Sequence, residues 1–305
     1  MPRLNLRRRA GYTLIEALVV MTLLGIIGGS LVSLLTRQQR FYRDAGETVA
    51  VRRELRTGAS LLPMEARSLS TVGGDVLAMS NGSFTFRATI GSGVACAVGS
   101  AALTLPPTNL AKHTLTAWYT PPAAGDTVFV FDEDTLAGAE DDKWRKYGVQ
   151  SVTTSTSACP GAPYTDAALD LPSTKPRWVL AVDGGPLPAS IKPGAVVRIT
   201  RPVRYSLFAA GSGRWYLGYE EHRGGAWSTV EPVGGPYLPS NGSGAGGGLR
   251  FAYFDTLGTT TTMRDRLARV DVVLRAESGP SSMPGREGEP LRDSLLFRIG
   301  IRNVK

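Results

Sequence analysis

The chain has few side chains that could perform catalysis, and their spacing matches no catalytic motif. Its two histidines, His113 and His222, lie in unrelated surroundings, and only His222 has neighbouring acids, Glu220 and Glu221, that could orient a general base. We interpret His222 as a surface histidine at the end of a polar strand. No His-x-x-x-His or Cys-x-x-Cys spacing suits a metal, and no Gly-x-Ser-x-Gly elbow is present. We therefore predict a non-enzymatic protein without a metal or cofactor.

Two acidic clusters and several aromatic residues could form binding sites. Residues 132–134 and 140–142 offer carboxylates that could bind Ca²⁺, but their spacing is not that of an EF-hand and three basic residues follow directly, so we interpret both as solvated loops. The aromatic residues could stack on sugars or single-stranded DNA, but we place most of them in the core or at its rim. From residue 71 onward the chain carries 23 basic and 21 acidic residues. This near balance argues against direct binding of nucleic acid.

The most unusual stretch joins a basic leader to a long apolar run. A run of three arginines, residues 7–9, lies just before Gly11, and from residue 12 to residue 35 the only ionisable side chains are the Tyr12 phenol and Glu16. A helix over these residues would be about 36 Å long at ~1.5 Å per residue, enough to cross a hydrocarbon core of roughly 30 Å. A carboxylate at the centre of such a span costs roughly 2.5–3.5 kcal/mol. Glu16 lies near the interface end, where the cost is lower, but insertion alone does not explain its presence.

The segment G-Y-T-L-I-E at residues 11–16 resembles the processing motif of type IV pilins and type II secretion pseudopilins. In that family a membrane-embedded aspartyl peptidase cuts after the glycine and methylates the new N-terminal amine, and the hydrophobic helix stays in the mature protein. The resemblance implies cleavage between Gly11 and Tyr12, methylation of Tyr12, and an assembly role for Glu16. Tyr12 replaces the phenylalanine that is most common there. An ordinary secretory signal is cleaved beyond its apolar region, whereas here the glycine precedes it.

We predict four parts along the chain: a leader (1–11), a transmembrane and fibre-core helix (12–35), the extramembrane half of the same helix (36–70) and a β-rich head (71–305). The leader arginines favour a cytoplasmic N-terminus with the head on the periplasmic side.

Three features of the helical region carry specific expectations. Pro63 should kink or interrupt the helix, because it lacks an N–H group and crowds the preceding turn. Gly73-Gly74 is the expected end. Gly25 and Gly29 have the GxxxG spacing of close helix packing, although glycines here could equally loosen the helix.

Period-two patterns predict strands in the head. In the two clearest strands, Val270, Val272, Leu274 and Ala276 share one face, and Leu295, Phe297, Ile299 and Ile301 share another. The other expected strands cover 83–90, 127–131, 177–183, 195–201, 203–208 and 214–221. We expect an α+β fold in which a largely antiparallel sheet packs against the end of the long helix.

The two cysteines, Cys96 and Cys159, would lie outside the cytoplasm, where a disulfide persists. We predict that they pair with each other, with two separate buried thiols as the alternative.

The C-terminal third resembles PilW-type minor pilins through its L-x-F-x-Y-x-D-x-x-G segment at residues 249–258 and the strands that follow. The resemblance implies a minor pilin that initiates assembly of a type IV pilus. Its partners would be the prepilin peptidase/methyltransferase, other major and minor pilins and the inner-membrane assembly platform. Its location would be the inner membrane and then the fibre at the cell surface. The alternatives are a J-type pseudopilin of type II secretion and a pilus-borne module for adhesion or DNA uptake.

Overall fold

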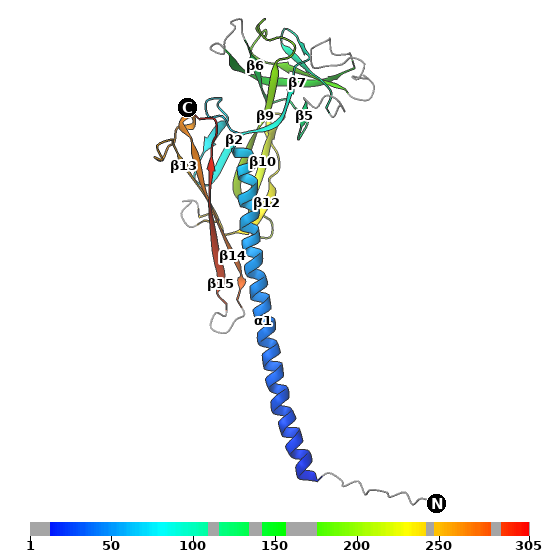
Figure 1. Cartoon of the computed structure of the whole chain (residues 1–305), viewed down its shortest axis with the longest axis vertical. Helices are drawn as coiled ribbons and strands as arrows, with labels where there is room; N and C mark the ends of the chain where they lie inside the picture. Colours follow the sequence, from blue (N-terminus) through cyan, green and yellow to red (C-terminus); the bar gives the residue numbers. More distant parts are fainter. Residues whose placement is uncertain are drawn as a thin grey trace, which may run out of the picture. The chain divides into compact units, whose positions relative to one another are not determined.

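The computed structural model describes residues 13–108, 116–133, 142–156, 176–241, 247–281 and 288–304. Within them, one long helix, α1 (Leu14–Ala66), precedes a set of strands and one 3-10 turn, η1 (Arg264–Arg266) (Figure 1). The chain divides into two compact units. One comprises Met1–Arg52 and Ser278–Arg292, and the other comprises Arg53–Glu277 and Asp293–Lys305.

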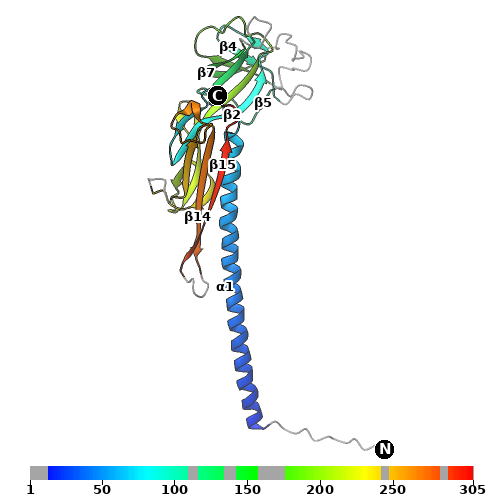
Figure 2. The ribbon, with the colours of Figure 1, turned by 60° about the vertical axis from the view of Figure 1, so that its left-hand side comes forward.

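Helix α1 is continuous through Pro63, so the expected interruption there is wrong (Figure 2). Pro63 lies in the final turn, where its missing N–H removes one backbone hydrogen bond and little helix remains to be displaced. The Pro63 carbonyl still accepts a hydrogen bond from the Arg67 N–H at 3.2 Å. The helix ends at Ala66 rather than at the expected Gly73-Gly74.

The N-terminal part of α1 is long and apolar enough to cross a membrane. One 18-residue window has a mean hydropathy of 2.4, and none of that window is buried. The hydroxyls of Thr22, Ser30 and Thr36 donate to backbone carbonyls three or four residues earlier, at 2.8–3.1 Å. These polar side chains are thus satisfied within the helix, as an apolar environment requires.

Twelve of the strands in the described part of the chain form one sheet, in the order β1-β2-β9-β6-β7-β8-β4-β3, with β5 beside β2 and with β10, β11 and β12 continuing from β9. Their bounds are β1 (Val76–Met79), β2 (Ser83–Val94), β3 (Ala97–Val98), β4 (Ala102–Leu105), β5 (Ala117–Trp118), β6 (Thr127–Asp132), β7 (Lys143–Ser155), β8 (Arg177–Val182), β9 (Val196–Ala209), β10 (Trp215–Arg223), β11 (Ala226–Trp227) and β12 (Glu231–Tyr237). The registered pairs in this sheet are antiparallel.

Strand β9 corrects the expectation of two separate strands on either side of Pro202. It is continuous, and it pairs with β2 along most of its length. On its other side it pairs with β6 as far as Thr200 and with β10 from Val203 onward. Pro202 therefore falls where the second partner changes, a place where a missing N–H costs little.

A second sheet contains β13 (Leu249–Phe254), β14 (Arg269–Pro280) and β15 (Pro290–Gly300) in that order. The predicted faces of the last two strands are confirmed. On β14, Val270, Val272, Leu274 and Ala276 are buried, while the intervening residues are only partly so. On β15 the exposed and more buried positions also alternate, ending at the buried Ile299.

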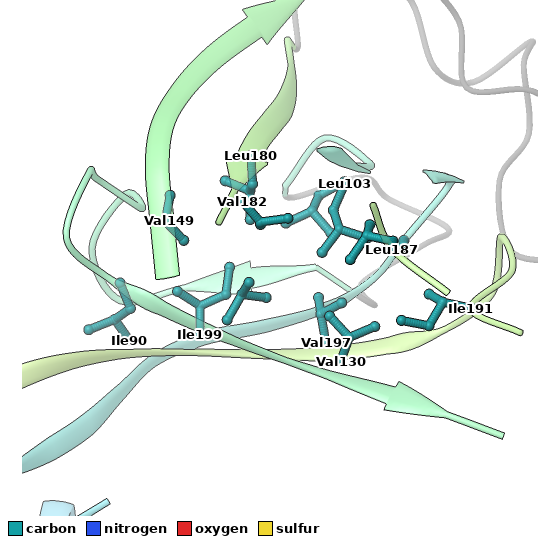
Figure 3. Close-up of a cluster of buried hydrophobic side chains, with 13 residues drawn as sticks. Ile90, Leu103, Val130, Val149, Leu180, Val182, Leu187, Ile191, Val197 and Ile199 are labelled. Atoms are coloured by element: carbon teal, nitrogen blue, oxygen red, sulfur yellow. The ribbon is translucent and has the colours of Figure 1, made fainter. Parts of the chain in front are cut away.

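The larger unit contains two groups of packed side chains. An aromatic group joins the two sheets, with Phe84 close to Phe86, Phe251 and Tyr253 at ring-centroid distances of 4.8–6.0 Å. The other group is aliphatic (Figure 3). It is drawn from β2, β4, β6, β7, β8 and β9 and includes Leu103, Val130, Leu180 and Ile199.

The C-terminal end of α1 packs tightly on the sheets. Leu55, Leu62 and Ala66 are buried. At Gly58 an added Cβ would lie 2.5 Å from the Tyr237 hydroxyl oxygen and 2.7 Å from Leu274 Cδ1. Glycine is therefore required here for the close approach of the helix. The sequence-based expectation of a helix packed on an antiparallel β-rich head is confirmed.

Candidate functional site

The N-terminus of α1 is capped by a reciprocal pair of hydrogen bonds between Thr13 and Glu16. The Glu16 N–H donates to the Thr13 hydroxyl at 3.4 Å, and the Thr13 N–H donates to the Glu16 carboxylate at 3.5 Å. This is the capping-box arrangement, in which the side chains of an N-cap threonine and of a glutamate three residues later each accept from the other residue's N–H. The Glu16 N–H also donates to the Thr13 carbonyl at 3.1 Å. Both side chains are exposed.

The capping box gives Glu16 a local role that the sequence-based interpretation missed. The signal was present as T-x-x-E immediately before an apolar run. A carboxylate at this position is also favoured by the positive end of the helix dipole. Gly11 and Tyr12, the predicted cleavage pair, lie outside the described residues, so processing and the assembly role of Glu16 stay predictions.

The GxxxG glycines line a shallow groove on the apolar, N-terminal part of α1. The groove, about 520 Å³ in volume, also contains Ser30 and Ser33. A Cβ added at Gly25 or Gly29 would meet nothing within 4 Å. Small residues on one helix face let a second helix approach closely.

One half of the predicted disulfide falls within the described residues. Cys96 is buried and disulfide-bonded, whereas Cys159 lies outside the described residues. The pairing of Cys96 with Cys159 stays a prediction, and non-reducing peptide mapping tests it. Recovery of both residues as free thiols from the exported protein would contradict it.

The residues considered for catalysis are not brought together. The acids beside His222 pair elsewhere, Glu220 with Arg204 at 2.7 Å and Glu221 with Arg201 at 3.0 Å. The His222 ring instead packs edge-on against Trp227. His113 lies outside the described residues, and the described residues contain no group of three or more side chains that could hold a metal.

The interpretation of residues 132–134 as a solvated loop is wrong for Asp132. This residue ends β6, is fully buried and forms an ion pair with Arg145 on β7. Lys143 is paired with Asp132 in the strand register, so the basic residues that follow the acids form a strand rather than a loop. Glu133 is exposed, and most of the second acidic cluster lies outside the described residues.

Sequence analysis also missed a buried ionic network in the larger unit. Arg201 is fully buried and contacts Asp126 at 2.8 Å and Glu221 at 3.0 Å. Burial alone would lower the pKa of Arg201, but the hydrogen bonds and charges of these two acids raise it. The network joins β9, β10 and the turn before β6, which is a structural rather than a catalytic arrangement.

The L-x-F-x-Y-x-D-x-x-G segment at residues 249–258 has a structural role at each of its fixed positions. Leu249, Phe251 and Tyr253 on β13 are buried. Asp255 accepts hydrogen bonds from the N–H groups of residues 257 and 259 at 3.0 and 2.8 Å. Gly258 has φ of 79°, which favours glycine. The pattern therefore describes one core strand followed by a tight turn.

Comparison with protein families finds one match. Residues 6–32 match the model described as a prokaryotic N-terminal methylation motif. Comparisons with curated proteins and with solved structures find no match. The motif, together with a membrane-compatible helix at the N-terminus, supports a membrane-anchored type IV pilin-like protein processed by prepilin peptidase.

Proposed function

We propose that this protein is a minor pilin of the PilW type, which helps to initiate assembly of a type IV pilus. The observation that carries the proposal is helix α1. The methylation motif, residues 6–32, includes most of the apolar first part of α1, which exposes a continuous apolar surface, and the last part of α1 is buried in a β-rich head. The apolar surface of such a helix must be covered by lipid before assembly and by neighbouring helices in the fibre after assembly.

The C-terminal segment supports the finer assignment. Residues 249–258 match the PilW-like pattern, and the side chains at its fixed positions either fill the core or shape the turn. The groove beside Gly25 and Gly29 supports close packing with neighbouring helices in a fibre.

Processing is tested first by mass spectrometry of the N-terminus of protein from membranes and sheared fibres. We expect the mature chain to begin at a methylated Tyr12. Substitution of Gly11 by a bulky residue should leave the leader attached and abolish entry into fibres, because no free amine forms at Tyr12. An intact leader on the wild-type protein beside an active prepilin peptidase would contradict the proposal.

A clean deletion then identifies the machine. Surface pili, twitching, protein secretion and DNA uptake are scored together. Loss of pili and twitching with secretion intact is the expected result. Loss of secretion alone would instead identify a J-type pseudopilin, and loss of DNA uptake with normal pili would identify an uptake component.

A further inference from the structure

A pocket of about 760 Å³ lies in the larger unit, outside every feature used above. Its walls come from the loop that follows α1, from strands β2, β6, β7 and β9, and from Asn303 near the C-terminus. Pockets that hold small ligands have volumes of about 300–1,000 Å³, so this one has room for a ligand of one or a few rings.

The floor of the pocket is the sheet face that turns away from the aliphatic core. Phe129 on β6 and Arg198 on β9 are paired in the register, while their neighbours Val128 and Ile199 belong to the core. Because successive side chains on a strand point to opposite faces, Phe129 and Arg198 lie on the outer face. The Arg198 guanidinium lies over the Phe129 ring, 5.4 Å from its centroid.

The floor and the loop wall are held in place by buried hydrogen bonds. Asp75, which is fully buried, accepts from the Ser70 N–H at 2.8 Å and from Arg198 at 2.6 Å. Arg198 Nε also donates to the Thr89 hydroxyl at 3.0 Å. On the far side of the loop, the Thr71 N–H donates to the carbonyl of Asn303 at 3.1 Å. The site is therefore formed before any ligand arrives.

One aromatic ring at the pocket is open to solvent and fixed in place. Trp144 on β7 is 50% exposed, and it packs against Phe131 with the ring centroids 5.4 Å apart. A large aromatic ring held by packing offers an apolar surface on which the C–H face of a sugar ring can stack, with little loss of side-chain entropy.

The polar groups around this ring fit hydroxyls and an anion. Ser70, Thr89 and Asn303 supply hydroxyl and amide groups, and Lys143 and Arg198 supply positive charge. None of the described residues that line the pocket is acidic. The two hydrogen bonds of Arg198 use two of the five N–H donors that a guanidinium carries.

We propose that this pocket binds a saccharide that carries a carboxylate, such as a uronic acid residue. The sugar ring stacks on Trp144, its carboxylate lies towards Lys143 and Arg198, and its hydroxyls bond to Ser70 and Thr89. Single-stranded nucleic acid fits less well. It needs a basic groove with successive stacking rings, whereas only one ring that lines this site, Trp144, is exposed.

The proposal is tested by calorimetric titration of the full-length processed protein in detergent micelles with trigalacturonic acid. Its neutral methyl ester and an oligothymidylate serve as comparison probes. We expect saturable binding of the acid and at least tenfold weaker binding of the ester and of the oligothymidylate. Absence of binding by the acid, equal binding of the ester, or tighter binding of the oligothymidylate would each overturn the proposal.

Substitutions then locate the binding. We expect Trp144→Ala to weaken binding at least tenfold and Lys143→Gln to weaken it several-fold. Both side chains are exposed, and thermal melting verifies that each variant is folded. Trp227→Ala removes another partly exposed tryptophan, on β11 outside the pocket, and should bind as the wild type does. Unchanged binding in folded Trp144→Ala would place the ligand elsewhere and reject this site.

Discussion

The two parts of helix α1 differ in whether their apolar side chains are exposed or buried, although they belong to one continuous helix. From residue 14 to residue 35, the leucines, isoleucines and valines are about half exposed or more, as at Leu31, which is 54% exposed. In the last part, from residue 53, Leu55, Leu62 and Ala66 are buried against the head. The backbone geometry is the same in both parts. What differs is whether the chain itself supplies the partner for the apolar face.

The difference shows which part of the helix is complete in a single molecule. The last part gains its stability from packing within the folded protein, since it is held by side chains such as Tyr237 and Leu274. The first part leaves a continuous apolar surface without a partner inside its unit, which in water would be strongly unfavourable. Lipid or neighbouring helices must cover it, and substitutions along the helix separate the two situations.

The largest effect is expected for Glu16→Gln in the first part. We predict that this carboxylate pairs with the N-terminal amine of an adjacent subunit during assembly, with the amine of Tyr12 in the same helix as the alternative partner. Stranding one charge of a pair that is buried in the fibre costs about 3–5 kcal/mol. The variant should be processed and inserted normally but depleted from sheared fibres. Thr13→Ala is the matched control, because it breaks the capping box at a cost of about 0.5–2 kcal/mol and keeps the carboxylate. Equal depletion of both variants would show that helix capping, not charge pairing, is the role of Glu16.

The next effect contrasts Leu62→Ala with Leu31→Ala. Leu62 is fully buried in the head, so its truncation should cost about 2–5 kcal/mol of unfolding free energy. Leu31 is exposed, so its truncation should leave the melting temperature in detergent unchanged and act only on incorporation into fibres. Thermal melting of both variants measures the contrast. Equal destabilisation by the two substitutions would contradict the division of the helix.

A third contrast uses the same substitution at two glycines. At Gly58 a new methyl group would clash with Tyr237 and Leu274, so Gly58→Ala should destabilise the protein by about 1–3 kcal/mol. At Gly46 a methyl group would meet nothing within 4 Å, and Gly46→Ala should stabilise the helix by up to about 1 kcal/mol. Denaturant unfolding measures the change in unfolding free energy for both variants and therefore its sign. A stabilising Gly58→Ala would mean that the helix end is less closely packed than described.

The smallest effect concerns pH. Burial raises the pKa of Glu65 above its ordinary value of 4.5, the Tyr205 hydrogen bond opposes the rise, and the charge of Glu221 adds to it. The protonated form is therefore favoured in the folded protein. Its contribution to stability is fully present below pH 4.5 and is lost as the pH rises through the raised pKa.

The substitution Glu65→Gln should remove the loss of stability that ionisation of Glu65 causes as the pH rises. Between about pH 5 and 7 the melting temperature of the wild type should fall by more than that of the variant, because only the wild type must ionise a poorly solvated carboxyl. The exposed Glu231 supplies the control, since Glu231→Gln should keep the wild-type slope. Identical slopes in the wild type and Glu65→Gln would remove Glu65 as the cause.

Sequence patterns predicted the parts of the fold in which a single hydrophobic periodicity runs along the whole element. The alternation at Val270, Val272 and Leu274 fixed the buried face of β14, because one side of that strand meets the core and the other meets solvent. Strand β7 was missed, because the run from Lys143 to Tyr147 mixes basic and aromatic residues with no continuous apolar face. Its stability comes from long-range partners such as Asp132, which no local pattern reveals.

The candidate sites show the same limit. The processing motif and the capping box each lie within a few consecutive residues, and both are visible in the sequence. The pocket beside Trp144 draws on a loop, four strands and a residue near the C-terminus. Its chemistry depends on Arg198 being held by Asp75, more than one hundred positions away along the chain. Only the pairing of β6 with β9 brings Phe129 and Arg198 to the same face of the sheet.

The pairing of β2 with β9 has a further consequence for how this head can diversify. The two strands stay paired, with one register shift between Thr89 and Gly91, up to Val94 opposite Val196, so the segment between them leaves and re-enters the sheet at adjacent positions. Facing residues of antiparallel strands have Cα atoms about 4.5–5.5 Å apart, a gap that a short turn can close. Residues 95–195 can therefore be exchanged as one segment, provided that Val197 and Ile199 regain an apolar cover and that the buried Arg201 regains an acid in place of Asp126. Helix α1 and the C-terminal sheet would stay the same while this segment of the head varies.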